Sequence, residues 1–287
     1  MLTINWTQDR PSMKVNRKND LVWLSYPELD RQDWLVNGFS TRLGGVSEGM
    51  FSSMNLSFTR GDDPEAVMEN YNRIGEGLGF RPEWVAASDQ IHAVNLRVVG
   101  EKDRGKGVTG ERDYSGIDGL LTNVPGVVLA TFFADCVPLY FVDPVHKAIA
   151  LSHSGWRGTV QRMGRETIRR MQKEYGTDPE DLFTAIGPSI CQDCYEVSED
   201  VIEAFRQEFP DELHERLFYP TIPGKYQLNL WEANRQILLD AGVREERIHL
   251  PGLCTCCNPE LLFSHRASKG KRGNLAAFLF IKDSVIV

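Results

Sequence analysis

Three apolar segments follow one another directly in the middle of the chain, and this succession limits the fold more than any other feature. Each is rich in β-branched or aromatic residues and is bounded by turn-forming residues, as strands are. They cover residues 127–133, 139–142 and 148–153. Because no helical pattern separates them, they are not the strand–helix–strand units of a regular barrel. The succession predicts an α+β fold in which a mixed β-sheet or sandwich core is flanked by helices.

Other strands and helices are expected around this centre. Further strand-like segments lie at residues 21–26, 34–40, 96–99, 182–186 and 275–281. A helix is expected after Asp63, which can cap it, with Pro64 in its first turn and Gly79 at its end. Similar helical periodicity covers residues 160–175, 199–209 and 230–241.

The chain shows no internal repeat and no flexible linker. With 287 residues it can bury one sizeable core. We therefore expect a single domain over residues 1–287, with residues 1–20 as a polar N-terminal arm and the glycine- and charge-rich residues 100–115 as a surface loop.

Charge and hydropathy exclude several classes of protein. The formal net charge of −8 argues against a nucleic-acid partner, because such binding needs a basic face. Residues 1–20 contain no apolar core of a secretory signal, and the apolar stretch 124–142 is interrupted by proline and Asp135, so no membrane span is expected. Six cysteines in such a chain favour thiols or metal ligands over disulfides and suggest a cytoplasmic location. Protein partners cannot be inferred from these features.

Asp135, Cys136 and His153 stand where apolar strands meet polar turns. A buried, unpaired carboxylate is so unfavourable that Asp135 needs a partner, a cleft or a metal. His153 ends a predicted strand, and the glycines that follow it let the backbone approach a ligand. Taken singly, however, Cys136 is typical of a small buried residue and His153 of a hydrogen-bonded structural histidine.

His92 lies on a predicted loop and supplies a third potential metal ligand. Two imidazoles and one thiolate match the ligands that zinc prefers, and three protein ligands leave a fourth position for water or substrate. The three residues are far apart in the chain, unlike a local zinc-finger pattern, so the residues alone leave this triad a hypothesis.

Short motifs along nearly the whole chain resemble those of the YfiH, or laccase-domain, family. They include NGFSTR at 37–42, NL at 55–56, QIH at 90–92, ADCVP at 134–138, HSGWRG at 153–158 and CYEV at 194–197. The resemblance extends over about residues 37–281 and implies a single-domain α+β fold. It also implies that zinc is bound by His92, Cys136 and His153. Where the family has Thr-Gly-Arg near its C-terminal end, this chain has Lys271-Arg272-Gly273, so no role is assigned to Arg272.

The resemblance implies a zinc-dependent purine nucleoside phosphorylase. Family members are described as acting on adenosine, inosine and methylthioadenosine with phosphate, and as having adenosine deaminase activity. Phosphorolysis needs an anion pocket, and a guanidinium can grip phosphate oxygens at two points, which makes Arg42 and Arg157 candidates. Asn55 and Gln90 are further candidate substrate contacts because they belong to the family motifs. Either arginine could instead form a surface ion pair.

Deamination would use the metal differently. Zinc lowers the pKa of bound water to about 7, and the resulting hydroxide can attack the purine carbon that bears the amino group. Asp135 is a candidate proton carrier for this reaction. The glutamate that follows a zinc-ligand histidine in the usual zinc deaminases is absent, because His92 is followed by Ala93 and Val94.

There are three alternatives to a zinc-dependent phosphorylase, of which two stay open and one is disfavoured. A cysteine hydrolase would use Cys136 as nucleophile and His153 as base, on a substrate such as a cell-wall precursor amide. A multicopper polyphenol oxidase, the older label of the family, is disfavoured because the chain has six histidines and no His-x-His pair, although a single Cu²⁺ is conceivable. A non-catalytic alternative is a four-cysteine structural metal site, or a cluster of buried thiols, formed by Cys191, Cys194, Cys254 and Cys257.

Overall fold

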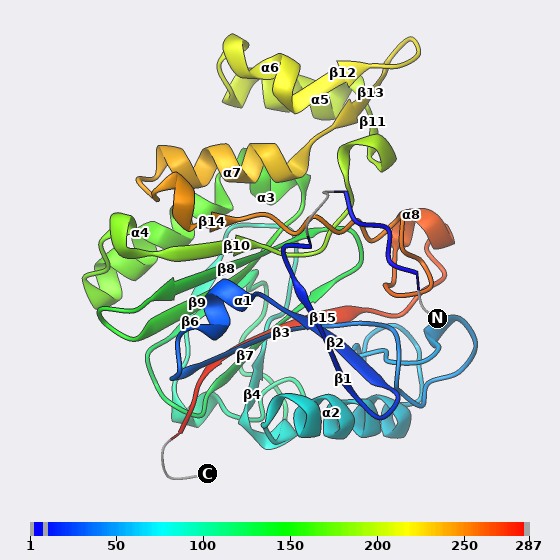
Figure 1. Ribbon diagram of the computed structural model, residues 1–287, viewed down its shortest axis with the longest axis vertical. Helices are drawn as coiled ribbons and strands as arrows, with labels where there is room; N and C mark the ends of the chain where they lie inside the picture. Colours follow the sequence, from blue (N-terminus) through cyan, green and yellow to red (C-terminus); the bar gives the residue numbers. More distant parts are fainter. Residues whose placement is uncertain (1–2, 8–10, 284–287) are drawn as a thin grey trace.

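The computed structural model describes residues 3–7 and 11–283, and it contains two six-stranded sheets that pack face to face (Figure 1). The first sheet has, in spatial order, β1 (Lys14–Lys18), β2 (Leu21–Ser25), β3 (Leu35–Ser40), β15 (Leu275–Ile281), β7 (Val128–Phe133) and β4 (Val85–Ala87). Its neighbours are antiparallel except for the parallel pair β4 and β7. β1 falls within the stretch that was expected to be a polar arm.

The second sheet carries the predicted central strands. Its spatial order is β14 (Ile248–His249), β10 (Phe183–Ile186), β8 (Val137–Asp143), β9 (Ala148–Ser154), β6 (Gly119–Thr122) and β5 (Leu96–Val98). β10 and β14 are parallel, as are β5 and β6, and the other pairs are antiparallel. The sheet is therefore mixed, as predicted, and its short strands β6 and β14 had no clear signal in the sequence.

The main core lies between the two sheets. Leu24, Phe39 and Leu129 of the first sheet and Tyr140 and Leu151 of the second are fully or almost fully buried in one apolar cluster. Such burial on the inner faces is the main favourable contribution to folding in a sandwich of this kind.

Helices cover both outer faces of the sandwich (Figure 1). α2 (Pro64–Leu78) packs on the first sheet, begins at the capping residue Asp63 and ends at Gly79, which adopts a left-handed conformation. α3 (Trp156–Val160), α4 (Met163–Tyr175) and α7 (Leu230–Asp240) lie on the second sheet. The prediction of a sandwich flanked by helices is confirmed.

A smaller group of elements stands beyond α7 in Figure 1. It comprises α5 (Glu199–Glu208), α6 (Asp211–Leu217) and a three-stranded sheet of β11 (Glu196–Ser198), β13 (Lys225–Leu228) and β12 (Phe218–Pro220). Two short helices, α1 (Pro27–Asp30) and α8 (His265–Ser268), complete the described part of the chain. Within the described residues, none of the helices combines the length and apolarity that crossing a membrane requires.

The helix predicted over residues 160–175 is present as α4, but it begins only at Met163, because the chain breaks between α3 and α4. Arg162 adopts a left-handed conformation, with φ of 57°. Its guanidinium bonds to Glu208 and, at 2.6 Å, to Asp240, so it ties the break to α5 and α7. The periodicity of the apolar residues alone could not show these distant partners.

Candidate functional site

The ends of strands in the second sheet bring His92, Cys136 and His153 together. Cys136 directly precedes β8, and the register of β8 against β9 pairs Pro138 with His153. His92 arrives on the loop between β4 and β5. The ligand atoms of the three residues all lie within 4.8 Å of one another, and Cys136 Sγ is 3.9 Å from His92 Nε2.

Asp118 orients both histidines and was not predicted. Its Oδ1 accepts hydrogen bonds from His153 Nδ1 at 3.0 Å and from the His92 backbone N–H at 2.9 Å. Its Oδ2 accepts the backbone N–H groups of Ile91 and Ala93. Burial opposes ionisation, but the hydrogen bonds from His153 and the backbone outweigh it and hold the pKa of Asp118 below its usual value. This arrangement leaves Nε2 of His153 free for a metal, as in many carboxylate–histidine–metal sites.

The electrostatics of the triad favour a thiolate at Cys136. Burial would raise the pKa of the Cys136 thiol, but the charge of His153 and hydrogen bonds from both histidines lower it below its ordinary value. Burial would lower the pKa of His153, but Cys136 and Asp118 raise it. Two nitrogen donors and a thiolate fit zinc, so the cluster is a potential metal site.

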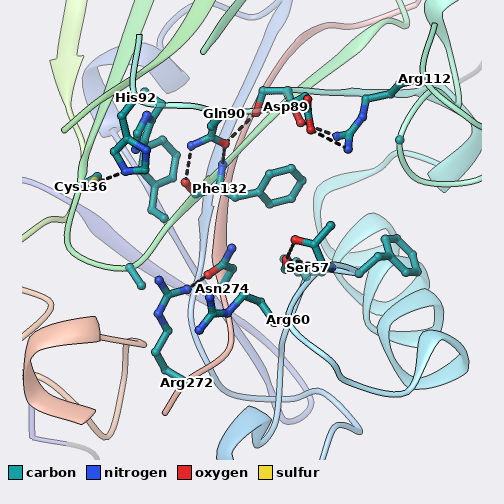
Figure 2. Close-up of a pocket in the computed structure, with 18 residues that line it drawn as sticks. Ser57, Arg60, Asp89, Gln90, His92, Arg112, Phe132, Cys136, Arg272 and Asn274 are labelled. Atoms are coloured by element: carbon teal, nitrogen blue, oxygen red, sulfur yellow. Dashed lines mark hydrogen bonds and ion pairs between the residues drawn. The ribbon is translucent and has the colours of Figure 1, made fainter. Parts of the chain in front are cut away.

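A cleft of about 310 Å³ opens beside the triad (Figure 2). Besides the three potential ligands, its walls include aromatic, hydroxyl and guanidinium groups: Phe58, Phe132, Phe133, Ser57, Thr59, Arg60, Arg112 and Arg272. Its volume is in the range of small-molecule sites, which are mostly apolar with a few convergent polar groups.

Two arginines on the wall opposite His92 have unused hydrogen-bonding capacity (Figure 2). The Nε atoms of Arg60 and Arg272 are buried and have no hydrogen-bond partner among the described residues. Arg272 bonds to Asn274 Oδ1, and Arg60 bonds to Gly270 O at 3.3 Å. Burial, followed by repulsion from Arg60, lowers the pKa of Arg272 to about 10. An anion placed between these guanidiniums would accept their unused hydrogen bonds and would offset the repulsion between their charges.

The two predicted arginines, Arg42 and Arg157, are not among the residues that line this cleft. Arg42 donates to the carbonyl oxygens of Ser52 and Pro259, at 2.7–2.9 Å, and packs over Phe263. Arg157 is exposed and stacks on Trp156. Backbone carbonyls and an aromatic ring already hold these two guanidiniums.

Asn55 and Asp135 also have structural partners instead of facing the cleft. Asn55 is fully buried and bonds to Ser57, Asp62 and the backbone N–H of Asn274. Asp135 accepts hydrogen bonds from Thr255 Oγ1 at 2.6 Å and from the Arg266 backbone N–H at 2.7 Å. Both of its oxygens are thus engaged, so the structure gives no support to the expected role of Asp135 as a proton carrier.

Gln90 lines the cleft, but its amide is used by the protein itself. It donates to Phe132 O at 2.8 Å and accepts from the Phe132 backbone N–H at 2.7 Å, while Ser88 Oγ donates to its carbonyl oxygen. Gln90 therefore holds the loop that carries His92 against β7.

The important residues that the sequence analysis missed are Asp118, Arg60, Arg112 and Arg272. Arg112 lies in a stretch expected to be a surface loop, yet it bonds to Ser88 O and Asp89 at the cleft. No local pattern marks these residues, because their neighbours in the cleft come from distant parts of the chain. Only the family's C-terminal arginine motif pointed near Arg272.

Comparison with known proteins decides the family. The family model described as "Multi-copper polyphenol oxidoreductase laccase" matches residues 36–282. The chain belongs to this family. The predicted resemblance is thereby confirmed.

Relatives and solved structures agree with this family. The chain is 38% identical over 267 residues to "Purine nucleoside phosphorylase YlmD" of Bacillus subtilis, covering 88% of this chain and 94% of that protein. It is 33% identical to "Adenosine deaminase RL5" of an unknown prokaryotic organism, covering 83% and 93%. The crystal structure of YlmD from Geobacillus stearothermophilus matches with a TM-score of 0.88 at 36% identity, covering 96% of this chain and all of that one. Bacillus licheniformis YfiH matches with a TM-score of 0.85 at 33% identity, covering 96% and 98%.

Proposed function

We propose that this member of the laccase family is a purine nucleoside phosphorylase whose active site is the cleft beside His92, Cys136 and His153. The names of its relatives support an enzyme that acts on nucleosides and phosphate. The observation that carries the proposal is that a potential metal triad and two incompletely bonded arginines, Arg60 and Arg272, line the same cleft. The guanidinium charges of Arg60 and Arg272 suit the phosphate anion, and the rest of the cleft is available to the neutral nucleoside.

The residues of the cleft suit the two substrates. Arg60 and Arg272 would bind phosphate, and the aromatic rings of Phe58 and Phe132 offer apolar surface to a purine. In phosphorolysis a phosphate oxygen forms a bond to C1′ of the ribose while the bond from C1′ to the purine nitrogen breaks, and the bonding electrons leave with the purine. The arginine charges would hold the phosphate in line for this attack.

The metal that fits the triad best is zinc. His92, Cys136 and His153 would hold it, and bound zinc would supply a Lewis acid that stabilises developing negative charge. Asp118 keeps His153 oriented through Nδ1 at 3.0 Å. Two imidazoles and one thiolate with an open fourth position are typical of catalytic zinc, and the six histidines of the chain are too few for a multicopper cluster.

The direct test is incubation of metal-quantified protein with adenosine and phosphate, followed by chromatography of the products. Phosphorolysis gives adenine and ribose 1-phosphate, whereas deamination gives inosine without any need for phosphate. Removal of the metal by chelation should abolish turnover, and zinc should restore it. Formation of inosine alone would replace the proposal by a deaminase, which the relative named as an adenosine deaminase makes the second candidate.

A cysteine hydrolase is a third candidate because Cys136, His153 and Asp118 form a nucleophile, base and orienting-carboxylate arrangement. The hydrolase hypothesis predicts that activity is insensitive to chelation and sensitive to alkylation of the thiol. Activity on an amide that survives chelation but is lost after alkylation of Cys136 would favour the hydrolase.

The arginine pair gives a specific prediction about phosphate. Arg272→Gln should raise the KM for phosphate by about tenfold to a hundredfold, since a hydrogen bond to a charged group contributes about 1.5–3 kcal/mol. The KM for adenosine should change much less. Steady-state kinetics with phosphate as the varied substrate measures this effect, and Arg169→Gln is the matched control because Arg169 is exposed on α4 and pairs with Glu166. An unchanged phosphate KM in Arg272→Gln would place the anion elsewhere.

A further inference from the structure

Four cysteines from two distant segments converge on one point outside the cleft. Cys191 and Cys194 lie on the loop after β10, and Cys254 and Cys257 lie on the segment between β14 and α8, drawn in orange (Figure 1). Their four Sγ atoms all lie within 4.8 Å of one another. Cys194 Sγ is 3.4 Å and Cys191 Sγ is 3.9 Å from Cys257 Sγ. All four residues are buried or half-buried free thiols.

This geometry matches a metal site better than a packed thiol cluster or a pair of disulfides. The sulfur–sulfur separations exceed the roughly 2.05 Å of a disulfide and suit four atoms placed around one ion. Each pair has two residues between its cysteines, and Cys191 directly precedes a short 3-10 turn (Gln192–Cys194) whose last residue is Cys194. Buried thiols that serve only for packing have no reason to gather as a group of four with this spacing.

We propose that Cys191, Cys194, Cys254 and Cys257 bind a second zinc ion through four thiolates. Four cysteine thiolates gathered around one point match the ligand set of closed, structural zinc sites. The four thiols release their protons to solvent when the metal binds. This proposal does not depend on the proposed function of the cleft.

The local backbone helps to hold the negative charge of such a site. The backbone N–H of Cys191 donates to Cys254 Sγ at 3.2 Å. The guanidinium of Arg266 lies nearby and donates to Cys194 O at 3.0 Å and to Glu196 O at 2.8 Å. Donors of this kind orient thiolates and offset their charge.

The second zinc site would fasten two segments that also hold the loop of Asp135 and Cys136. Thr255, between the third and fourth cysteines, donates to Asp135 Oδ1, and the backbone N–H of Ile190 donates to Asp135 O at 3.0 Å. Asp135 itself adopts a left-handed conformation with φ of 90°, which its neighbours must maintain. The four-cysteine site therefore stabilises the loop of Asp135 and Cys136 beside the cleft, and it takes no part in the reaction.

Metal analysis of purified full-length variants tests this proposal. Wild-type protein should contain one zinc ion at the four cysteines and, together with the zinc proposed for the cleft, two per chain. Cys257→Ser should lose one of them, while Cys256→Ser, from the same segment but outside the group of four, should keep both. Cys136→Ala should also lose one, but a different one. X-ray absorption on Cys136→Ala protein should then show four sulfur neighbours at about 2.3 Å.

Several results would overturn the four-cysteine site. One is the absence of zinc from Cys136→Ala protein supplied with the metal. Another is a mixed nitrogen and sulfur shell around the remaining zinc in that variant. A third is a mass of freshly purified wild-type protein that shows a disulfide among these residues. Because Cys136→Ala leaves all four cysteines intact, the proposal stays testable even if Cys257→Ser does not fold, and inactivity of the wild-type enzyme on nucleosides would not affect it.

Discussion

Two buried aspartates pair with histidines in the described part of the chain, and one of these pairs reaches the candidate metal site. Asp118 bonds to His153 Nδ1 at 3.0 Å, and Asp143 bonds to His146 Nδ1 at 2.9 Å. Both carboxylates are fully buried, and both also accept backbone N–H groups. The pairs differ in the histidine, because His153 is buried beside Cys136 and His92 whereas the His146 side chain is exposed.

This difference gives a prediction about metal affinity. Asp118→Asn should weaken zinc binding by about tenfold to a hundredfold, because it removes the negative charge and one of the two acceptor oxygens that orient His153 and the backbone of the His92 loop. Asp143→Asn should lower the free energy of unfolding about as much as Asp118→Asn does, but it should leave the zinc affinity unchanged. Competition with a chromophoric chelator measures the affinity and denaturant unfolding measures the stability. Equal zinc affinity in the two variants would contradict an orienting role for Asp118.

Asp103 gives a prediction about stability and pH. It is buried, and although burial opposes its ionisation, hydrogen bonds from Lys106, the Gly100 backbone and Arg97 hold its pKa below the usual value. As the pH falls, the unfolded chain therefore takes up this proton before the folded chain does. The stabilisation is complete above the unfolded pKa of about 3.9 and is lost as the pH falls through the folded pKa.

Asp103→Asn should consequently destabilise the protein by about 1–3 kcal/mol near neutral pH, with a deficit that shrinks in acid. Urea unfolding at a series of pH values checks this. Asp113→Asn is the control, because Asp113 pairs with the same Lys106 but is exposed, where an ion pair contributes little. A deficit independent of pH would show that Asp103 is not ionised in the folded state.

At the scale of elements, the turn between β9 and α3 lies close to His92 and Cys136 of the candidate metal site. A Cβ atom at Gly155 would lie 3.1 Å from His92 Cδ2 and 3.2 Å from Cys136 Sγ. Gly158, one turn further on, has room, since a Cβ there would lie at least 3.6 Å from its neighbours. The absence of a side chain at Gly155 thus keeps the space around the ligands open.

The two glycines predict opposite outcomes. Gly155→Ala should displace His92 or Cys136 and lower both zinc content and turnover, with little change in the free energy of unfolding of the metal-free protein. Gly158→Ala should retain zinc and stabilise α3 by up to about 1 kcal/mol, because alanine is the better helix former. Zinc analysis and chemical unfolding of both variants provide the measurement. Full zinc content in Gly155→Ala would show that the turn tolerates a side chain.

The elements also show how far local patterns reach. The capping Asp63 and the terminal Gly79 predicted α2 closely, because both signals act within the helix itself. The start of the helix predicted over residues 160–175 was placed too early, because the break at Arg162 depends on partners in α5 and α7. Short strands such as β4 and β6 gave too few residues for a pattern.

At the scale of the whole molecule, two tyrosines link the sheets across the core. Tyr140 Oη on β8 donates to Gly38 O on β3 at 3.0 Å, and Tyr26 Oη donates to Ile186 O on β10. Their rings meet edge to face with centroids 6.0 Å apart. Burial raises the pKa of both hydroxyls well above the usual value, so they remain protonated donors.

Tyr140→Phe should lower the free energy of unfolding by about 1 kcal/mol, since a buried acceptor loses its donor. Zinc content should not change, because the Tyr140 hydroxyl donates to Gly38 O and to none of the three potential metal ligands. Tyr219→Phe is the control, because Tyr219 is exposed and its effect should stay within about 0.5 kcal/mol. Denaturant unfolding measures the stability, and metal analysis measures the zinc content. If Tyr140→Phe were as stable as the wild type, the bond from Tyr140 to Gly38 O would not hold the sheets together.

The amino-acid sequence by itself determined the class of fold, the family and the kinds of donor atoms available. Runs of β-branched residues and helix caps act over a few positions, so they can be read locally. The choice among arginines was decided only in three dimensions: Arg42 is held by the carbonyls of Ser52 and Pro259, whereas Arg272 faces the cleft. Hydrogen-bond partners drawn from distant segments decide where a guanidinium or a carboxylate points, and those partners meet only when the two sheets pack.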